Sequence, residues 1–186
     1  MPHVYHASKA QNLKIIETRI STHGKPWVYA MSKPEHALIF IGTEGDLVNQ
    51  VGFINSQPCI IERFQNSLEY SAENKSGSVY TLDGSDFKSR VTSFKEELVC
   101  EHNCEVLEET KIEDVLKSLL DLEKKGLITI YRYPNAPEGF PKDKSDLIER
   151  AVMWSKQFPV ADILRDIEKY HPDILEEVTR RVGMEG

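Results

Sequence analysis

Short apolar runs dominate the first two-thirds of the chain. Up to about residue 106 these runs are rich in β-branched and aromatic residues and are separated by Gly, Ser and Asn, a pattern typical of strands. Four of them predict strands at 28–30, 59–64, 78–82 and 98–100. This part of the chain is therefore expected to be built on a sheet.

From Thr110 onward the spacing of apolar residues lengthens to that of amphipathic helices. Thr110 and Glu113 form a capping-box pattern, in which a hydroxyl and a carboxylate satisfy free backbone N–H groups. A helix is therefore expected to begin there and to end near Gly126. The short apolar run at 128–131 then predicts one more strand.

The last third of the chain predicts a separate helical unit. The segment 133–141 holds three prolines in nine residues and is expected to be an irregular connector. Helical patterns follow at about 144–157, 160–170 and 173–182. The sequence thus predicts an α+β domain over residues 1–133, and a connector with a C-terminal helical cap over 134–186.

Composition narrows the class of protein. The 186 residues are 40% hydrophobic and 28% charged, with a net charge of −7, which argues against a broad nucleic-acid or anionic-membrane surface. A membrane span needs about 20 consecutive apolar residues, and no run approaches that length. The first residues lack the basic and apolar regions of a signal peptide, and the three cysteines show no framework spacing. A cytoplasmic protein without membrane partners is expected.

Two segments carry candidate chemistry in the first part of the domain. His6 follows Tyr5 at the end of the first expected strand; a structural histidine would look the same. Tyr29 lies at a strand end, and a second capping-box pattern from Ser32 to Glu35 predicts a helix directly after it. A tyrosine there can line a cleft or pack in the core.

A third candidate is the adjacent pair Glu96 and Glu97 at the start of the expected strand at 98–100. Consecutive strand residues face opposite sides of a sheet, so only one of the two carboxylates can face a cleft. The sequence leaves open which of them does, and a solvated face would also account for both.

Taken in order, these segments resemble the ADP-ribosyltransferase superfamily, in the branch with a His, Tyr, Glu triad that includes diphtheria toxin and the poly(ADP-ribose) polymerases. The matching segments are His6-Ala7-Ser8, Tyr29-Ala30 and Glu97-Leu98-Val99, and the resemblance covers roughly residues 4–107. Ala7 stands where the family has glycine. Ser32 and Phe40 are approximate substitutes for the serine and second tyrosine of the family helix. Lys95 stands where the arginine-specific enzymes carry an acidic or amide residue.

The resemblance implies a split β-sheet with a central cleft that takes NAD as the substrate and breaks its nicotinamide–ribose bond. Glu97 would stabilise the cationic ribose, His6 would donate to a ribose hydroxyl, and Tyr29 would stack on nicotinamide. The residues expected to contact NAD are His6, Ala7, Ser8, Tyr29, Ser32 and Phe40, with Lys25 of the loop at 21–25 on the diphosphate path. The acceptor is unknown, and a protein is favoured over a nucleic acid.

Three alternatives accompany this hypothesis. The chain can be a non-enzymatic binding or regulatory module that keeps the fold. It can be an RNA 2′-phosphotransferase, which ranks lower because this chain is acidic and opens directly on the His6 segment. Finally, Cys100, His102 and Cys104 offer three zinc ligands, but structural zinc usually takes four, so no metal is expected.

Overall fold

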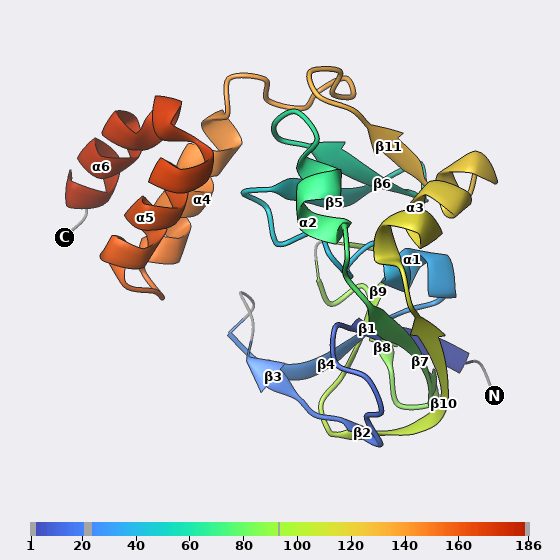
Figure 1. Ribbon diagram of the computed structural model, residues 1–186. Helices are drawn as coiled ribbons and strands as arrows, with labels where there is room; N and C mark the ends of the chain where they lie inside the picture. The colour runs from blue at the N-terminus through green and yellow to red at the C-terminus, as the bar shows by residue number, and fades with distance from the viewer. Residues whose placement is uncertain (1–2, 21–23, 93, 185–186) are drawn as a thin grey trace.

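The computed structural model describes residues 3–20, 24–92 and 94–184. These residues form a mixed α+β fold, which confirms the predicted class. The described strands form two sheets, and three helices end the chain. In Figure 1 short helices lie between and around the sheets, and the C-terminal helices (orange to red) gather on one side. None of the described helices combines the length and the apolar character that crossing a bilayer requires.

The larger sheet carries most of the strands expected from the sequence. Its described strands follow the order β2-β10-β7-β1-β4-β9-β8, with β3 paired to β4 beside this path, and all neighbouring pairs are antiparallel. Their bounds are β1 His3–Ser8, β2 Ile15–Ile16, β3 Arg19–Ile20, β4 Pro26–Met31, β7 Gly77–Asp83, β8 Lys88–Ser89, β9 Glu97–Cys100 and β10 Cys104–Ile112.

The smaller sheet has the order β11-β6-β5, in which β5 and β6 form an antiparallel hairpin and β11 is parallel to β6. The bounds are β5 Asn49–Ile54, β6 Gln57–Glu62 and β11 Thr129–Tyr131, with helices α1 Pro34–Leu38, α2 Ser67–Ala72 and α3 Val115–Lys124. One apolar core joins the sheets through these helices, since Val79 of β7, Ile60 of β6 and Leu119 of α3 belong to the same buried cluster.

The helix expected from Thr110 begins later. Thr110 lies in β10, which stays paired with β7 as far as Ile112. The cap of α3 is instead Asp114, whose carboxylate accepts the N–H of Lys117 at 2.8 Å. The prediction that a helix begins at Thr110, made from the capping-box pattern of Thr110 and Glu113, was therefore wrong. Pairing of this segment with the neighbouring strand β7 overrides the local helix signal.

The second predicted helix cap, at Ser32, was also wrong, although a helix does follow it. Lys33, not Ser32, occupies the N-cap position of α1, and no side chain caps this helix. Pro34 is its first residue, where a missing N–H costs little. α1 is only five residues long, and packing against the core holds it more than its ends do.

The three C-terminal helices are confirmed. They are α4 Ser145–Ser155, α5 Val160–Tyr170 and α6 Leu175–Met184, with a 3-10 turn η1 Pro172–Ile174 before the last. Their apolar faces form a core of their own, in which Leu147, Ile167 and Val178 are fully buried and against which Leu47 packs. Residues 134–186 are called the helical extension below.

The start of β7 leaves no room for a side chain. A Cβ at Gly77 would lie 2.6 Å from the backbone oxygen of Ser8 and 3.1 Å from Cγ2 of Ile41. Since a backbone contact cannot swing aside, Gly77→Ala is expected to lower the free energy of unfolding by about 1–3 kcal/mol, measured by urea denaturation. Gly52→Ala in β5 is the matched control, because its Cβ would meet only Cys59 Sγ at 3.9 Å. Equal losses in the two variants would contradict this account.

Candidate functional site

Three neighbouring strands carry the three candidate residues. His6 lies in β1, Tyr29 in β4 and Glu97 in β9, and these strands are adjacent in the order β1-β4-β9. Tyr29 pairs with Val99, which is two residues from Glu97 along β9, so the side chains of Tyr29 and Glu97 share a face of the sheet.

His6 lies where β1 and β4 part. The described pairing between these strands consists of one residue pair, Tyr5 with Met31, whereas β1 pairs with β7 along its whole length. Next to that pair, the His6 ring nitrogen Nδ1 lies 2.7 Å from the backbone oxygen of Tyr29. The imidazole thus makes a hydrogen bond between the two strands at a point beside the one residue pair that joins their backbones.

This contact fixes how His6 can act. A carbonyl only accepts, so Nδ1 carries the proton and Nε2 of the neutral ring is an acceptor. Burial lowers the pKa of His6 below its ordinary value, against the opposing effect of the Tyr29 carbonyl, and so favours the neutral ring near pH 7. In the neutral ring Nε2 is thus an acceptor, whereas the resemblance implied that His6 donates to a ribose hydroxyl.

One cavity of about 620 Å³ unites the candidate residues. This volume falls in the range of small-molecule sites, roughly 300–1,000 Å³. Four of the residues expected to contact NAD line the cavity, namely His6, Ala7, Tyr29 and Phe40, and so does the catalytic candidate Glu97. Two acidic side chains and one cationic side chain are among the described lining residues, and the remaining ones are apolar, aromatic, amide, hydroxyl or imidazole groups.

The two glutamates of the β9 region differ in placement. Glu97 is 8% exposed and lines the cavity, opposite Met31 of β4. Glu96 lies in the turn before β9, is half-buried, and is not among the lining residues. The carboxylate that can meet a ligand in this cavity is therefore that of Glu97.

Three expected contact residues lie elsewhere. Ser8 ends β1, where its hydroxyl accepts the N–H of Ala10 at 3.1 Å. Ser32 is exposed in the bend after β4, and Lys25 is exposed with its ammonium 5.5 Å from the ring centre of Trp27. None of the three lines the cavity. Residues 21–23 of the loop expected near the diphosphate lie outside the described residues.

The wall opposite the strands was not foreseen from the sequence. It consists of the loop before β5 and the start of β5, together with one side chain of the helical extension, and its polar members are Thr43, Asp46, Asn49, Gln50 and Arg150. Gly42 and Gly45 are the local sequence signal of a shaped loop there, since both adopt positive φ angles, as does Glu44 between them.

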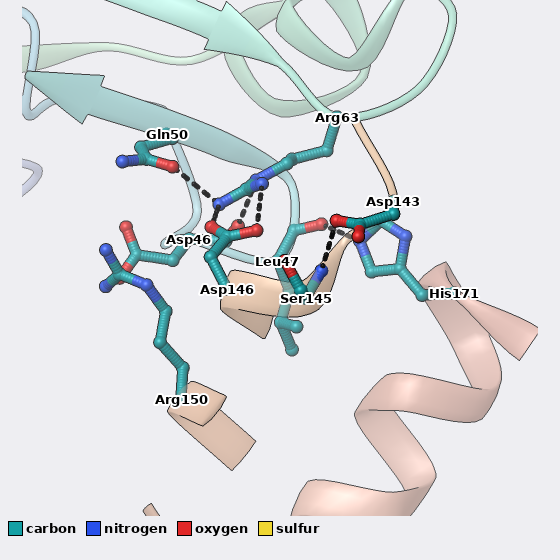
Figure 2. Close-up of polar contacts among 9 residues, drawn as sticks. All are labelled: Asp46, Leu47, Gln50, Arg63, Asp143, Ser145, Asp146, Arg150 and His171. Carbon is teal, nitrogen blue, oxygen red and sulfur yellow. Dashed lines mark hydrogen bonds and ion pairs between the residues drawn. The ribbon is translucent and has the colours of Figure 1, made fainter. Parts of the chain in front are cut away.

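A buried arginine ties this wall to the helical extension. Arg63, which follows β6, donates to both carboxylate oxygens of Asp146 in α4, at 2.5 and 3.1 Å. It also donates to Gln50 Oε1 at 2.6 Å and to the backbone oxygen of Asp46 at 3.0 Å. Figure 2 shows its guanidinium between Gln50 and Asp146. The polar side of the cavity wall is thereby fixed against α4.

Two further contacts join the loop to the extension. Arg150, one helical turn after Asp146, forms an ion pair with Asp46. His171 is fully buried, and its Nε2 donates to the backbone oxygen of Leu47 at 2.6 Å (Figure 2). Burial lowers the pKa of His171, so the ring that makes this bond is neutral near pH 7.

Asn49 holds the other side of the same loop. Its side chain is 1% exposed, donates to Ser71 Oγ at 2.8 Å and to the Ser67 backbone oxygen at 3.1 Å, and accepts from Ser67 Oγ at 2.7 Å. A buried amide with these partners is rigid. The loop is therefore pinned to α2 on one side and to the helical extension on the other.

The cysteine cluster lies away from the cavity, at the turn between β9 and β10. The ligand atoms of Cys100, His102 and Cys104 all lie within 4.8 Å of one another. In the parts of the chain that the structure describes, no fourth His, Cys, Asp or Glu ligand atom lies within that distance of all three, although Asp86 Oδ2 lies 3.1 Å from His102 Nε2. Burial raises the pKa of the Cys104 thiol to about 12. That this chain binds no metal stays a prediction.

Comparisons of the chain with protein-family models, with curated proteins and with solved structures found no match. The chemistry of the cavity residues is therefore the basis on which a function is assigned.

Proposed function

We propose that this chain cleaves NAD between nicotinamide and ribose and transfers the ADP-ribosyl group to an acceptor or to water. One observation carries the proposal: His6, Tyr29 and Glu97 come from three adjacent strands and line the same cavity. These are the residues by which the sequence resembles the His, Tyr, Glu branch of the ADP-ribosyltransferases.

The proposed reaction needs a negative charge beside the ribose, and a carboxylate can supply it. When the C–N bond breaks, its electron pair leaves with neutral nicotinamide, and the ribose develops oxocarbenium character, as in glycoside hydrolysis. An atom of the acceptor or of water then bonds to the same carbon and releases its proton to the solvent. The buried Glu97 carboxylate supplies negative charge where the cation forms, in a setting that screens it less than water does.

The other two residues orient the substrate. Nε2 of His6 accepts a hydrogen bond from a ribose hydroxyl, because the Nδ1–H group is bound to the Tyr29 carbonyl. The half-buried Tyr29 ring, packed edge-on against Trp27 with ring centres 6.1 Å apart, offers a flat apolar face to nicotinamide. Ala7 borders the cavity with its backbone, which can bond the carboxamide.

The acceptor is proposed to be a protein or water. The chain carries a net charge of −7, and one Lys or Arg lines the described part of the cavity. A nucleic-acid acceptor would require neutralisation of several phosphates, which this arrangement does not offer.

Nicotinamide release from NAD by the purified protein tests the proposal. We expect release in buffer alone or, if water is a poor acceptor, release together with labelling of added proteins by biotin-tagged NAD. NAD binding with neither release nor labelling would support the binding-module alternative instead. Absence of NAD binding, by calorimetry, would contradict the proposal altogether.

A further inference from the structure

More acidic than basic side chains are found among the described residues that line the cavity. Glu97 lies on the strand side and Asp46 on the loop side, and Arg150 is the single Lys or Arg among the described lining residues. NAD carries two negative charges on its diphosphate. If this cavity takes NAD, which is the proposed function, the diphosphate needs a cation to offset repulsion from the two carboxylates.

The two arginines at this wall are not equally available. Arg63 is 2% exposed at its side chain, and its guanidinium is engaged by Asp146, Gln50 and the backbone of Asp46. Arg150 is 33% exposed, and its one described partner is the Asp46 carboxylate. A ligand anion can therefore bind Arg150 by exchange with Asp46, whereas binding Arg63 would break a buried network.

The position of Arg150 is fixed by its helix. Asp146 and Arg150 are four residues apart in α4 and so lie on the same face. Because Asp146 is bound by the two terminal nitrogens of the Arg63 guanidinium, this face is held toward the loop that carries Asp46 (Figure 2). The guanidinium of Arg150 is thus held at the cavity by an anchor that does not take part in ligand binding.

We propose that Arg150 of the helical extension binds the diphosphate of NAD, leaving Asp46 to do so. Arginine suits this task because its planar fork can donate to two phosphate oxygens at once. The extension then completes the binding site, and it takes the role that the sequence suggested for Lys25.

The test compares two ligands in the Glu97→Gln background, where turnover is suppressed. Calorimetry measures the Kd of NAD and of nicotinamide riboside, which has the same nicotinamide and ribose but no phosphate. Arg150→Ala is expected to raise the Kd of NAD by about tenfold or more and to leave that of nicotinamide riboside within about twofold. Arg150→Lys is expected to recover part of the loss, because it keeps the charge without the fork.

Two further variants separate a ligand contact from a structural one. Asp46→Asn removes the competing charge and is expected to lower the Kd of NAD, the opposite of what damage to the wall would do. Arg181→Ala is the matched control, because Arg181 forms a comparable ion pair with Glu149 within the helical extension and does not line the cavity. It is expected to leave both Kd values unchanged.

The outcomes distinguish this inference from the proposed function. If Arg150→Ala leaves both Kd values unchanged, or raises both equally, the diphosphate site is wrong while NAD binding stands. If the parent protein binds neither NAD nor nicotinamide riboside, the proposed function fails and takes the diphosphate site with it.

Discussion

Glu97→Gln is expected to slow nicotinamide release by about 100-fold or more, with little change in the KM for NAD. Glutamine has nearly the same shape, so substrate binding is retained, but the negative charge that the ribose cation meets in the transition state is lost. Preorganised electrostatic groups contribute rate factors of about 10²–10³. A loss confined to kcat identifies an interaction made in the transition state. Steady-state nicotinamide release over a range of NAD concentrations gives both constants.

The neighbouring glutamate offers a matched control. Glu96→Gln makes the same change of charge one residue away, at a side chain that is half-buried and outside the cavity lining. It is expected to keep kcat within about threefold, since a charge outside the cavity acts through solvent. Equal losses in both variants would show that net charge, not the Glu97 carboxylate, controls the rate. A larger loss in Glu96→Gln would overturn the assignment.

Asp146→Ala is expected to lower the free energy of unfolding by about 3–5 kcal/mol, because it leaves the buried guanidinium of Arg63 without its carboxylate partner. The side chain of Arg63 is 2% exposed, so the charge left after the substitution is poorly solvated. The centre of the Phe140 ring lies 4.6 Å from the guanidinium carbon of Arg63, so this ring also shields the guanidinium from water. Urea denaturation followed by far-UV circular dichroism measures the loss.

An exposed ion pair in the same helical extension shows what a surface contact contributes. Asp162 and Arg165 in α5 are both more than half exposed, and Asp162→Ala is expected to cost less than about 1 kcal/mol. If Asp146→Ala cost no more than Asp162→Ala, Arg63 would not depend on Asp146. The double variant Arg63→Met with Asp146→Leu is expected to recover much of the loss, because apolar replacement removes both buried charges.

The sequence predicted those elements whose signal is local. The helices at 144–182 follow from apolar spacing, and they form a core largely of their own. The strands around Tyr29 and Glu97 follow from β-branched runs. Prediction failed at Thr110, where pairing of β10 with β7 decides the conformation from outside the segment. The strand β5 was missed because Asn49, Gln50 and Gly52 interrupt its apolar pattern.

The same distinction holds for the candidate site. His6, Tyr29 and Glu97 were chosen because each lies in a short motif next to an expected strand end, and they line one cavity. Which glutamate faces that cavity required the register of β9 with β4. Arg150 could not have been chosen, because its partner Asp46 lies 104 residues earlier and neither residue stands in a recognisable motif. Side chains brought together only by packing leave no pattern in the sequence.

The double anchoring of the loop that carries Asp46 has a thermodynamic consequence. The same loop borders the cavity and contacts the helical extension. The free energy of ligand binding and the free energy of docking the extension are therefore coupled. A ligand that requires the docked wall must strengthen the attachment of the extension by the same factor by which the extension strengthens ligand binding. Conversely, any molecule that drew the extension away through its outer face would weaken ligand binding without entering the cavity.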